Sequence, residues 1–264
     1  MSGSLHVVDA GAGPAVLAVH GLGGGAWFFA PLAEPLRHHL RLLAVDLPGT
    51  GRSAASGPMS IDGWVAELGD LIDERVPAPE QVVLLGHSMG TIIALQAWRA
   101  WPGRIRGLVL VGGLPRARPL IRDRLMERLA GLEHADSLAG WGSKVSPGVF
   151  SPATFRADPK VVADFEAAFE AQPVDSYRRS IRMLLDADAS GIAGTVTVPT
   201  LILSGADDQY APPDLVHAFA AEFPTPPTVE VLPDIGHVPF LEHPGRVAAA
   251  VAAFASGAAG LSSA

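Results

Sequence analysis

A serine between two glycines is the first candidate for chemistry in this chain. Ser88 is the centre of Gly86-His-Ser-Met-Gly90, which follows an apolar run at 82–85 and precedes a helix-like stretch at 91–101. A turn this tight strains the serine backbone, and glycines keep side chains from colliding with the neighbouring strand and helix. The serine would stand at a helix N-terminus, where the positive end of the helix dipole faces the charge developing on a substrate carbonyl. The pattern predicts a nucleophilic serine in a strand-turn-helix context, although a plain turn can carry the same five residues.

Two later positions could activate this serine. Asp207 and Asp208 follow an apolar run at 200–203, and His237 follows another at 228–232. A serine hydroxyl becomes a good nucleophile when an imidazole accepts its proton, and a carboxylate fixes the tautomer of that imidazole. The order serine, acid, histidine is the one expected on an open parallel sheet. The chemistry alone leaves both aspartates open as the acid.

Two other loops follow predicted strands. The first, His20-Gly-Leu-Gly-Gly-Gly25, is so rich in glycine that its backbone N–H groups would be open to a ligand. It lacks the G-x-G-x-x-G spacing, so nucleotide binding is weakly supported. Asp46 stands at the end of the next strand, and we expect a structural role there, in which its carboxylate accepts hydrogen bonds from backbone N–H groups of its loop.

The elements that must position these residues alternate along the chain. The predicted strands cover residues 5–8, 15–19, 40–45, 81–85, 105–111, 200–203 and 228–232. The predicted helices cover residues 26–38, 61–72 (with Ser60 as its N-cap), 91–101, 212–223 and 246–254. This alternation predicts an α/β fold with a mostly parallel central sheet and helices on both faces. In such a sheet, ligands bind beyond the carboxyl ends of the strands, where all these polar residues fall.

The strand pattern stops between residues 114 and 188. This segment contains helical patches at 121–132, 161–171 and 176–185 and no convincing strand. We interpret residues 114–188 as a helical cap inserted after a central strand, and residues 1–113 and 189–264 as the core. The aromatic residues of the cap could line a substrate cavity or pack the cap on the core, and packing is the favoured interpretation for any one of them. Residues 257–264 are typical of a frayed tail.

Composition excludes several classes of partner and site. The net charge of −8 over 264 residues disfavours nucleic acid as a partner. The absence of cysteine excludes disulfides, thiolate nucleophiles and thiolate metal sites. The first residues do not form a basic and apolar leader, and no apolar run approaches membrane-spanning length. We therefore expect a soluble, cytoplasmic protein without a membrane partner, and the oligomeric state stays open.

The sequence resembles the α/β-hydrolase fold superfamily, in its serine-nucleophile esterase and lactonase branch, over nearly the whole chain. The motifs that carry the resemblance are His20-Gly21, Asp46-x-Pro-Gly-x-Gly-x-Ser53, Gly86-x-Ser-x-Gly90, Gly205-x-x-Asp208 with Pro212 four residues on, and Gly236-His237 followed by Pro239 and His243-Pro244. The resemblance implies that Ser88 is the nucleophile, His237 the general base and Asp208 the orienting acid. It implies an oxyanion hole formed by the backbone N–H groups of Leu22 and Met89. The residues expected to contact the substrate are Trp27, His87, Trp141 and Val238.

The expected reaction is hydrolysis of a small or medium carboxylic ester or lactone through an acyl-enzyme intermediate. Ser, His and Asp suffice for this chemistry, so we expect neither a metal nor an organic cofactor. Alternatives on the same residues are a carbon-carbon bond hydrolase of the meta-cleavage-product type, a cofactor-free perhydrolase or haloperoxidase, a synthase, and a ligand receptor of low turnover. Gly24 stands where the meta-cleavage-product hydrolases have proline, and Thr91 where they and many esterases have glycine. These departures weaken both narrow assignments.

Substrate choice is expected to depend on the cap, because the triad and the oxyanion hole treat most acyl groups alike. The cap begins with a series of arginines that could select an anionic substrate or could form a solvated helix face. The sequence favours the solvated face. These residues are Arg116, Arg118, Arg122, Arg124 and Arg128.

Overall fold

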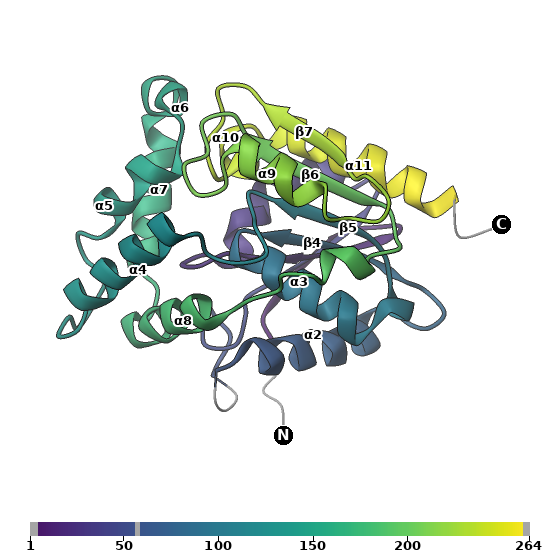
Figure 1. The fold of residues 1–264 in the computed structure, drawn as a ribbon, viewed down its shortest axis with the longest axis horizontal. Helices are drawn as coiled ribbons and strands as arrows, with labels where there is room; N and C mark the ends of the chain where they lie inside the picture. Colours follow the sequence, from purple (N-terminus) through teal and green to yellow (C-terminus); the bar gives the residue numbers. More distant parts are fainter. Residues whose placement is uncertain (1–4, 56–58, 261–264) are drawn as a thin grey trace.

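The computed structural model describes residues 5–55 and 59–260, which form a seven-stranded sheet with helices on both faces (Figure 1). The strands are β1 Val7–Gly11, β2 Ala15–Val19, β3 Arg41–Val45, β4 Val82–His87, β5 Ile105–Val111, β6 Thr200–Gly205 and β7 Thr228–Leu232. Their order across the sheet is β1-β3-β2-β4-β5-β6-β7, and only the β1–β3 pair is antiparallel. The predicted α/β class with a mostly parallel sheet is confirmed.

The central strands are buried along their whole length. Every residue of β2, β4, β5 and β6 is buried, as expected for parallel strands covered on both faces. The edge strands β1 and β7 are partly exposed. β1 differs from the predicted strand at 5–8, because it begins at Val7 and continues through Gly11. The extension follows from its partner, since Gly11 pairs with Arg41 at the start of β3.

The helices of the core cover the two faces of the sheet. In Figure 1, α2 Ile61–Arg75 and α3 Met89–Ala100 lie below it and α11 Pro244–Gly260 lies above it. α11 packs against α1 Ala30–Leu36, and α9 Pro213–Ala220 packs against β6 and β7. The short elements are η1 Ala26–Phe29, η2 Pro102–Arg104, η3 Ala193–Thr195 and α10 Pro239–Glu242. Ser60 caps α2 as predicted, because its hydroxyl accepts a hydrogen bond of 3.0 Å from the N–H of Gly63. No helix of the described residues is long and apolar enough to span a membrane.

The C-terminal helix is longer than the sequence indicates. α11 runs to Gly260, so residues 257–260 are helical instead of belonging to a frayed tail. The reason is packing, since Ala255 and Ala258 are buried with 1% and 3% exposure and hold the last turns against the core. The rest of the predicted tail, residues 261–264, lies outside the described residues.

Five helices fill the long segment between β5 and β6. They are α4 Pro119–Gly131, α5 Gly142–Val149, α6 Pro152–Ala157, α7 Pro159–Glu170 and α8 Val174–Asp186. Figure 1 shows α4 to α7 as a group at the left, beyond the ends to which the β4 and β5 arrows point. An antiparallel bridge between Arg116 and Asp188 brings the two ends of the segment together. The division of the chain into a core and a cap at 114–188 stays a prediction.

Two of these five helices were not expected from the sequence. α5 contains Pro147 and Gly148, both of which disfavour a helix interior. α6 is only six residues long, and its start depends on a cap in which the Ser151 hydroxyl accepts a hydrogen bond from the N–H of Thr154. Tertiary packing therefore overrides local propensity here, since Val145 and Val149 of α5 are buried in the core.

Candidate active site

Ser88 occupies a strained turn between β4 and α3. Its backbone has φ 53° and ψ −116°, a region that non-glycine residues rarely adopt. A Cβ on Gly86 would lie 2.3 Å from the carbonyl oxygen of Gly90, and a Cβ on Gly90 would lie 2.3 Å from that of Val19. Both flanking positions therefore require glycine. Ser88 is partly exposed while the other four residues of the motif are buried, so the turn presents the serine alone.

Ser88, His237 and Asp208 form a continuous hydrogen-bonded chain. The Ser88 Oγ lies 3.0 Å from His237 Nε2, and His237 Nδ1 lies 2.9 Å from the Oδ2 of Asp208. The other carboxylate oxygen of Asp208 accepts hydrogen bonds from the N–H groups of Tyr210 and Ala211, at 2.7 and 3.0 Å. Because a carboxylate only accepts, Nδ1–H of His237 must donate to it, which leaves Nε2 to accept from the serine hydroxyl. The geometry suits removal of the serine proton by His237.

The structure separates the two candidate acids. Asp208 is 3% exposed and reaches His237, whereas Asp207 is exposed to solvent and contributes its backbone N–H to the carbonyl of Ile235. Gly112 at the end of β5 has a φ of +54°, and a Cβ there would lie 3.0 Å from Asp208 Oδ2 and 3.1 Å from His237 Nδ1. A glycine at 112 thus leaves room for the aspartate and histidine to meet.

The predicted oxyanion donors lie on either side of Ser88. Met89 begins α3, and the first N–H groups of a helix have no partner inside it. Leu22 lies in a turn closed by the hydrogen bond of 3.1 Å from the N–H of Gly24 to the carbonyl of Gly21. Both Leu22 and Met89 line the same cavity as Ser88. Their backbone N–H groups are therefore the candidate donors to a substrate oxygen.

Two buried side chains hold the loops around this site. His20 is fully buried, and its ring bridges the carbonyl of Gly21 at 2.7 Å and the N–H of Leu47 at 3.1 Å. Asp46 accepts hydrogen bonds from the N–H groups of Ala26 at 2.6 Å and Arg52 at 2.9 Å. The predicted structural role of Asp46 is confirmed, because its carboxylate ties its own loop to the start of η1.

His87 holds the backbone of His237 in place through a hydrogen bond. Its Nε2–H donates to the carbonyl oxygen of His237 at 2.9 Å, and its Nδ1 is buried without a hydrogen-bond partner among the described residues. Burial, and then the nearby His237, hold the pKa of His87 well below its usual range. His87 is therefore neutral in the folded protein, and it lines the cavity; its contact with substrate stays a prediction.

The buried neutral His87 predicts a pH-dependent stability. Because its folded-state pKa lies below its unfolded value near 6.5, the unfolded chain binds a proton first as the pH falls. The free energy of unfolding should be at its maximum above about pH 7. It should decrease below pH 6.5, and His87 should account for up to about 1.4 kcal/mol of this decrease per pH unit. Urea unfolding at pH 7.5 and 5.5 measures the loss. His87→Gln, which keeps a donor for the His237 carbonyl, should show a smaller loss, and an equal loss in both proteins would exclude His87 as its source.

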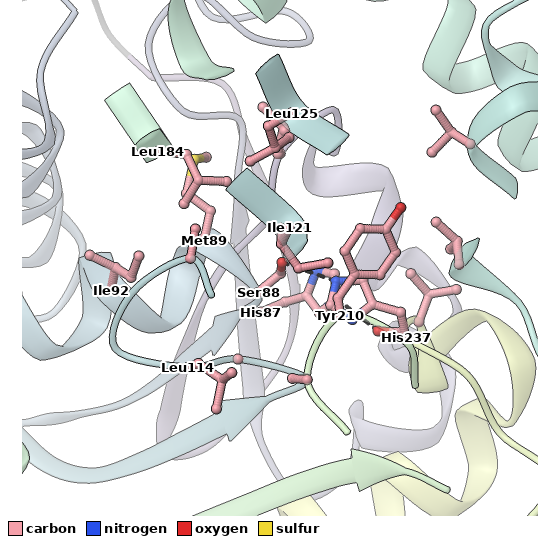
Figure 2. Close-up of a pocket in the computed structure, with 18 of the residues that line it drawn as sticks. His87, Ser88, Met89, Ile92, Leu114, Ile121, Leu125, Leu184, Tyr210 and His237 are labelled. Atoms are coloured by element: carbon pink, nitrogen blue, oxygen red, sulfur yellow. Dashed lines mark hydrogen bonds between the residues drawn. The ribbon is translucent and has the colours of Figure 1, made fainter. Parts of the chain in front are cut away.

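A largely apolar cavity opens above Ser88 between the sheet and α4, α5, α7 and α8 (Figure 2). Its polar lining consists of His87, Ser88, Arg116, Arg118, Arg128, Tyr210 and His237. Its apolar lining consists of Leu22, Phe28, Met89, Ile92, Leu114, Ala117, Ile121, Leu125, Val145, Val149, Phe165, Phe169, Leu184, Ala211 and Val238. His87 and Val238, both predicted to contact substrate, thus belong to the cavity wall.

The two tryptophans predicted to contact substrate lie outside the residues that line this cavity. Trp27 packs against Phe28 and Phe165, with ring centroids 4.4 and 5.9 Å apart, and its neighbour Phe28 faces the cavity instead. Trp141 lies beside an outer recess, where the Lys144 ammonium is 4.4 Å from its ring centroid. Trp27 thus packs within η1 and against Phe165 of α7. Packing was the favoured sequence interpretation for the aromatic residues of the segment 114–188, and Trp141 agrees with it.

Tyr210 is a cavity residue that sequence reasoning missed. Its ring centroid lies 4.6 Å from that of His237, and Figure 2 shows its hydroxyl pointing away from the imidazole. A signal for it did exist, because Tyr210 follows Asp208 by two residues at the same strand end. Within the described part of the chain, no group of three or more His, Asp or Glu side chains could hold a metal ion.

Comparison with known proteins agrees with this fold over nearly the whole chain. The model of the alpha/beta hydrolase family matches residues 16–250. The Pimeloyl-[acyl-carrier protein] methyl ester esterase of Chromobacterium violaceum is 31% identical over 249 residues, which cover 91% of this chain and 93% of that protein. A thermophilic esterase from Thermogutta terrifontis, solved with malate bound, superposes with a TM-score of 0.88 at 25% identity and covers 96% of this chain and 93% of that one. The enol-lactonase of Burkholderia xenovorans LB400 shares the fold, with a TM-score of 0.84, 22% identity and 96% of each chain covered. This chain is therefore a hydrolase and belongs to the alpha/beta hydrolase family.

Proposed function

We propose that this protein is a serine hydrolase that cleaves a small or medium carboxylic ester or lactone. The observation that carries the proposal is the hydrogen-bonded chain from Ser88 through His237 to Asp208, with the serine presented at a largely apolar cavity. The named function of the Chromobacterium violaceum relative, a methyl ester esterase, supports the same reaction class.

Acylation follows from the positions of these groups. The Ser88 oxygen attacks the carbonyl carbon while its proton moves to His237 Nε2, and Asp208 stabilises the imidazolium that forms. The N–H groups of Leu22 and Met89 would donate to the oxyanion, and each such donor contributes roughly 10²- to 10³-fold in rate. When the tetrahedral intermediate collapses, His237 returns its proton to the leaving alkoxide, which is released as an alcohol. For a lactone, the alcohol stays attached to the acyl group.

Deacylation repeats these steps with water. His237 Nε2 takes a proton from a water molecule, whose oxygen attacks the acyl carbon of the Ser88 ester. The second intermediate releases the carboxylic acid as the proton passes back to the Ser88 oxygen. Because the residues that line the cavity are mainly apolar, we propose that they hold the acyl chain and that α4 to α8 act as the cap that selects it.

Hydrolysis of p-nitrophenyl esters with acyl chains of two to ten carbons tests this function. We expect turnover with an optimum at short or medium chains, where the acyl group fills the cavity, and loss of that turnover in Ser88→Ala. Absence of turnover by a folded protein across the series would refute the ester assignment and favour one of the other reactions considered for this triad.

A further inference from the structure

Three arginines line the cavity, and the structure gives them different partners. Arg116 forms an ion pair with Asp188, at 3.6 Å. Arg118 donates to the backbone carbonyls of Gln209 and Tyr210, so it holds the loop that follows Asp208. Both side chains are thus engaged in tying the chain together.

Arg128 on α4 is different. Its Nη1 donates to the hydroxyl oxygen of Tyr177 at 2.8 Å, and no carboxylate of the described residues lies within ion-pair distance of its guanidinium. Burial raises the pKa of Tyr177, so this phenol is neutral at physiological pH and cannot balance the charge. Arg128 is therefore a half-buried cation at the cavity wall without an anionic partner.

An unpaired cation beside an apolar cavity is costly unless something compensates it. Desolvation weakens the hydration of the guanidinium, and a neutral phenol replaces only part of it. The guanidinium carries five donors in a planar fork that matches both oxygens of a carboxylate. A planar monoanion on a ligand in the cavity, such as a carboxylate, would therefore complement the Arg128 guanidinium.

Tyr210 relates this cation to the reaction centre. Its ring lies 4.6 Å from the His237 ring, while its hydroxyl end points away from His237 (Figure 2) and interacts with Arg128. One tyrosine side chain thus spans the distance between the candidate base and the arginine. Ile121, Leu125 and Val145 complete the wall, so an apolar chain can run between the two polar ends.

We propose that Arg128 binds a carboxylate at the far end of the substrate's acyl chain, so that the preferred substrates are half-esters of short dicarboxylic acids. The proposal rests on the proposed ester hydrolysis and names its substrate class. Ser88 attacks the ester carbonyl, the Arg128 guanidinium holds the free carboxylate, and the apolar wall contacts the methylene groups between them.

Matched pairs of methyl esters test this specificity. Monomethyl succinate, glutarate and adipate are compared with methyl butanoate, pentanoate and hexanoate, which have the same acyl lengths without the carboxylate. Methanol release gives kcat/KM for each ester, and the ratio of half-ester to neutral ester is the readout. We expect the ratio to favour the half-ester and to fall roughly 10- to 100-fold in Arg128→Met, since the lost bonds are charge-assisted.

Two variants control for charge and folding. Arg124→Met removes the same charge from the same helix at an exposed position outside the cavity lining, and it should leave the ratio unchanged. Arg128→Lys keeps a cation and should retain part of the preference. If Arg128→Met lowers both ester classes equally or leaves the ratio unchanged, Arg128 is not the carboxylate site.

A binding measurement separates this inference from the proposed reaction. Calorimetry follows the binding of monomethyl glutarate to Ser88→Ala and to Ser88→Ala/Arg128→Met, so the result does not depend on turnover. At least tenfold weaker binding to the double variant supports the carboxylate site even where no ester is hydrolysed. Equal affinity, or no binding to either protein, overturns it whatever the esterase assays show.

Discussion

Ser88→Ala is expected to lower kcat for ester hydrolysis by roughly 10⁴- to 10⁶-fold, because it removes the nucleophile and with it the covalent route. The KM should change little, since the cavity wall and the oxyanion donors remain. The substitution removes a hydroxyl whose partner in the hydrogen-bonded chain is His237, so the fold should persist. Steady-state kinetics with p-nitrophenyl butanoate, together with a thermal melt of each protein, measure both expectations.

A second serine provides the matched control for this variant. Ser256 is exposed on α11, and among the described residues its hydroxyl donates a hydrogen bond only to the carbonyl of Ala252, at 2.9 Å. Ser256→Ala should therefore retain full activity. If Ser88→Ala hydrolyses the ester at a rate near that of the wild type, the reaction does not pass through Ser88 and the proposed mechanism is wrong.

Asp208→Asn is expected to lower kcat by about 10⁴-fold, because the orienting group changes from an acceptor to a mixed donor and acceptor. The N–H groups of Tyr210 and Ala211 fix one oxygen of residue 208 as an acceptor. The asparagine NH₂ would then face His237 and donate to Nδ1, which forces the proton onto Nε2. That tautomer cannot accept the Ser88 proton.

Asp207→Asn is the control for this substitution, since it makes the same chemical change one residue earlier. Asp207 is exposed and makes no contact with His237, so its variant should stay within about twofold of the wild-type rate. Equal losses in both variants would show that the charge of the loop, rather than the hydrogen bond to His237, supports activity.

Much of the site could be predicted because its parts follow strands whose ends meet at one edge of the sheet. The bounds of β2, β5 and β7 agree with the predicted strands, since short apolar runs between turn residues leave little choice. Ser88 and His237 could be paired across 149 positions from their motifs alone. The choice of Asp208 over Asp207 depended on a family spacing, and the structure agrees because only Asp208 faces the imidazole.

The cavity wall was harder to predict, since it depends on how the helices after β5 pack. A tryptophan and its neighbour in η1 look alike in the sequence, yet Phe28 lines the cavity and Trp27 packs beside it. The arginines of α4 could not be distinguished by type or spacing. Their partners come from elsewhere, as when Tyr177 of α8 meets Arg128, and such long-range contacts leave no local signal.

Acid quench during turnover followed by peptide mass spectrometry tests the central claim most directly. Mixing the protein with excess p-nitrophenyl acetate and quenching within the first turnovers should trap the acetyl group on the peptide that contains Ser88. His237→Ala, which lacks the proposed base, should accumulate little of this adduct. An acetyl group on Ser88 in the wild type is the predicted result, and rapid ester hydrolysis without any adduct on Ser88 would contradict the acyl-enzyme mechanism.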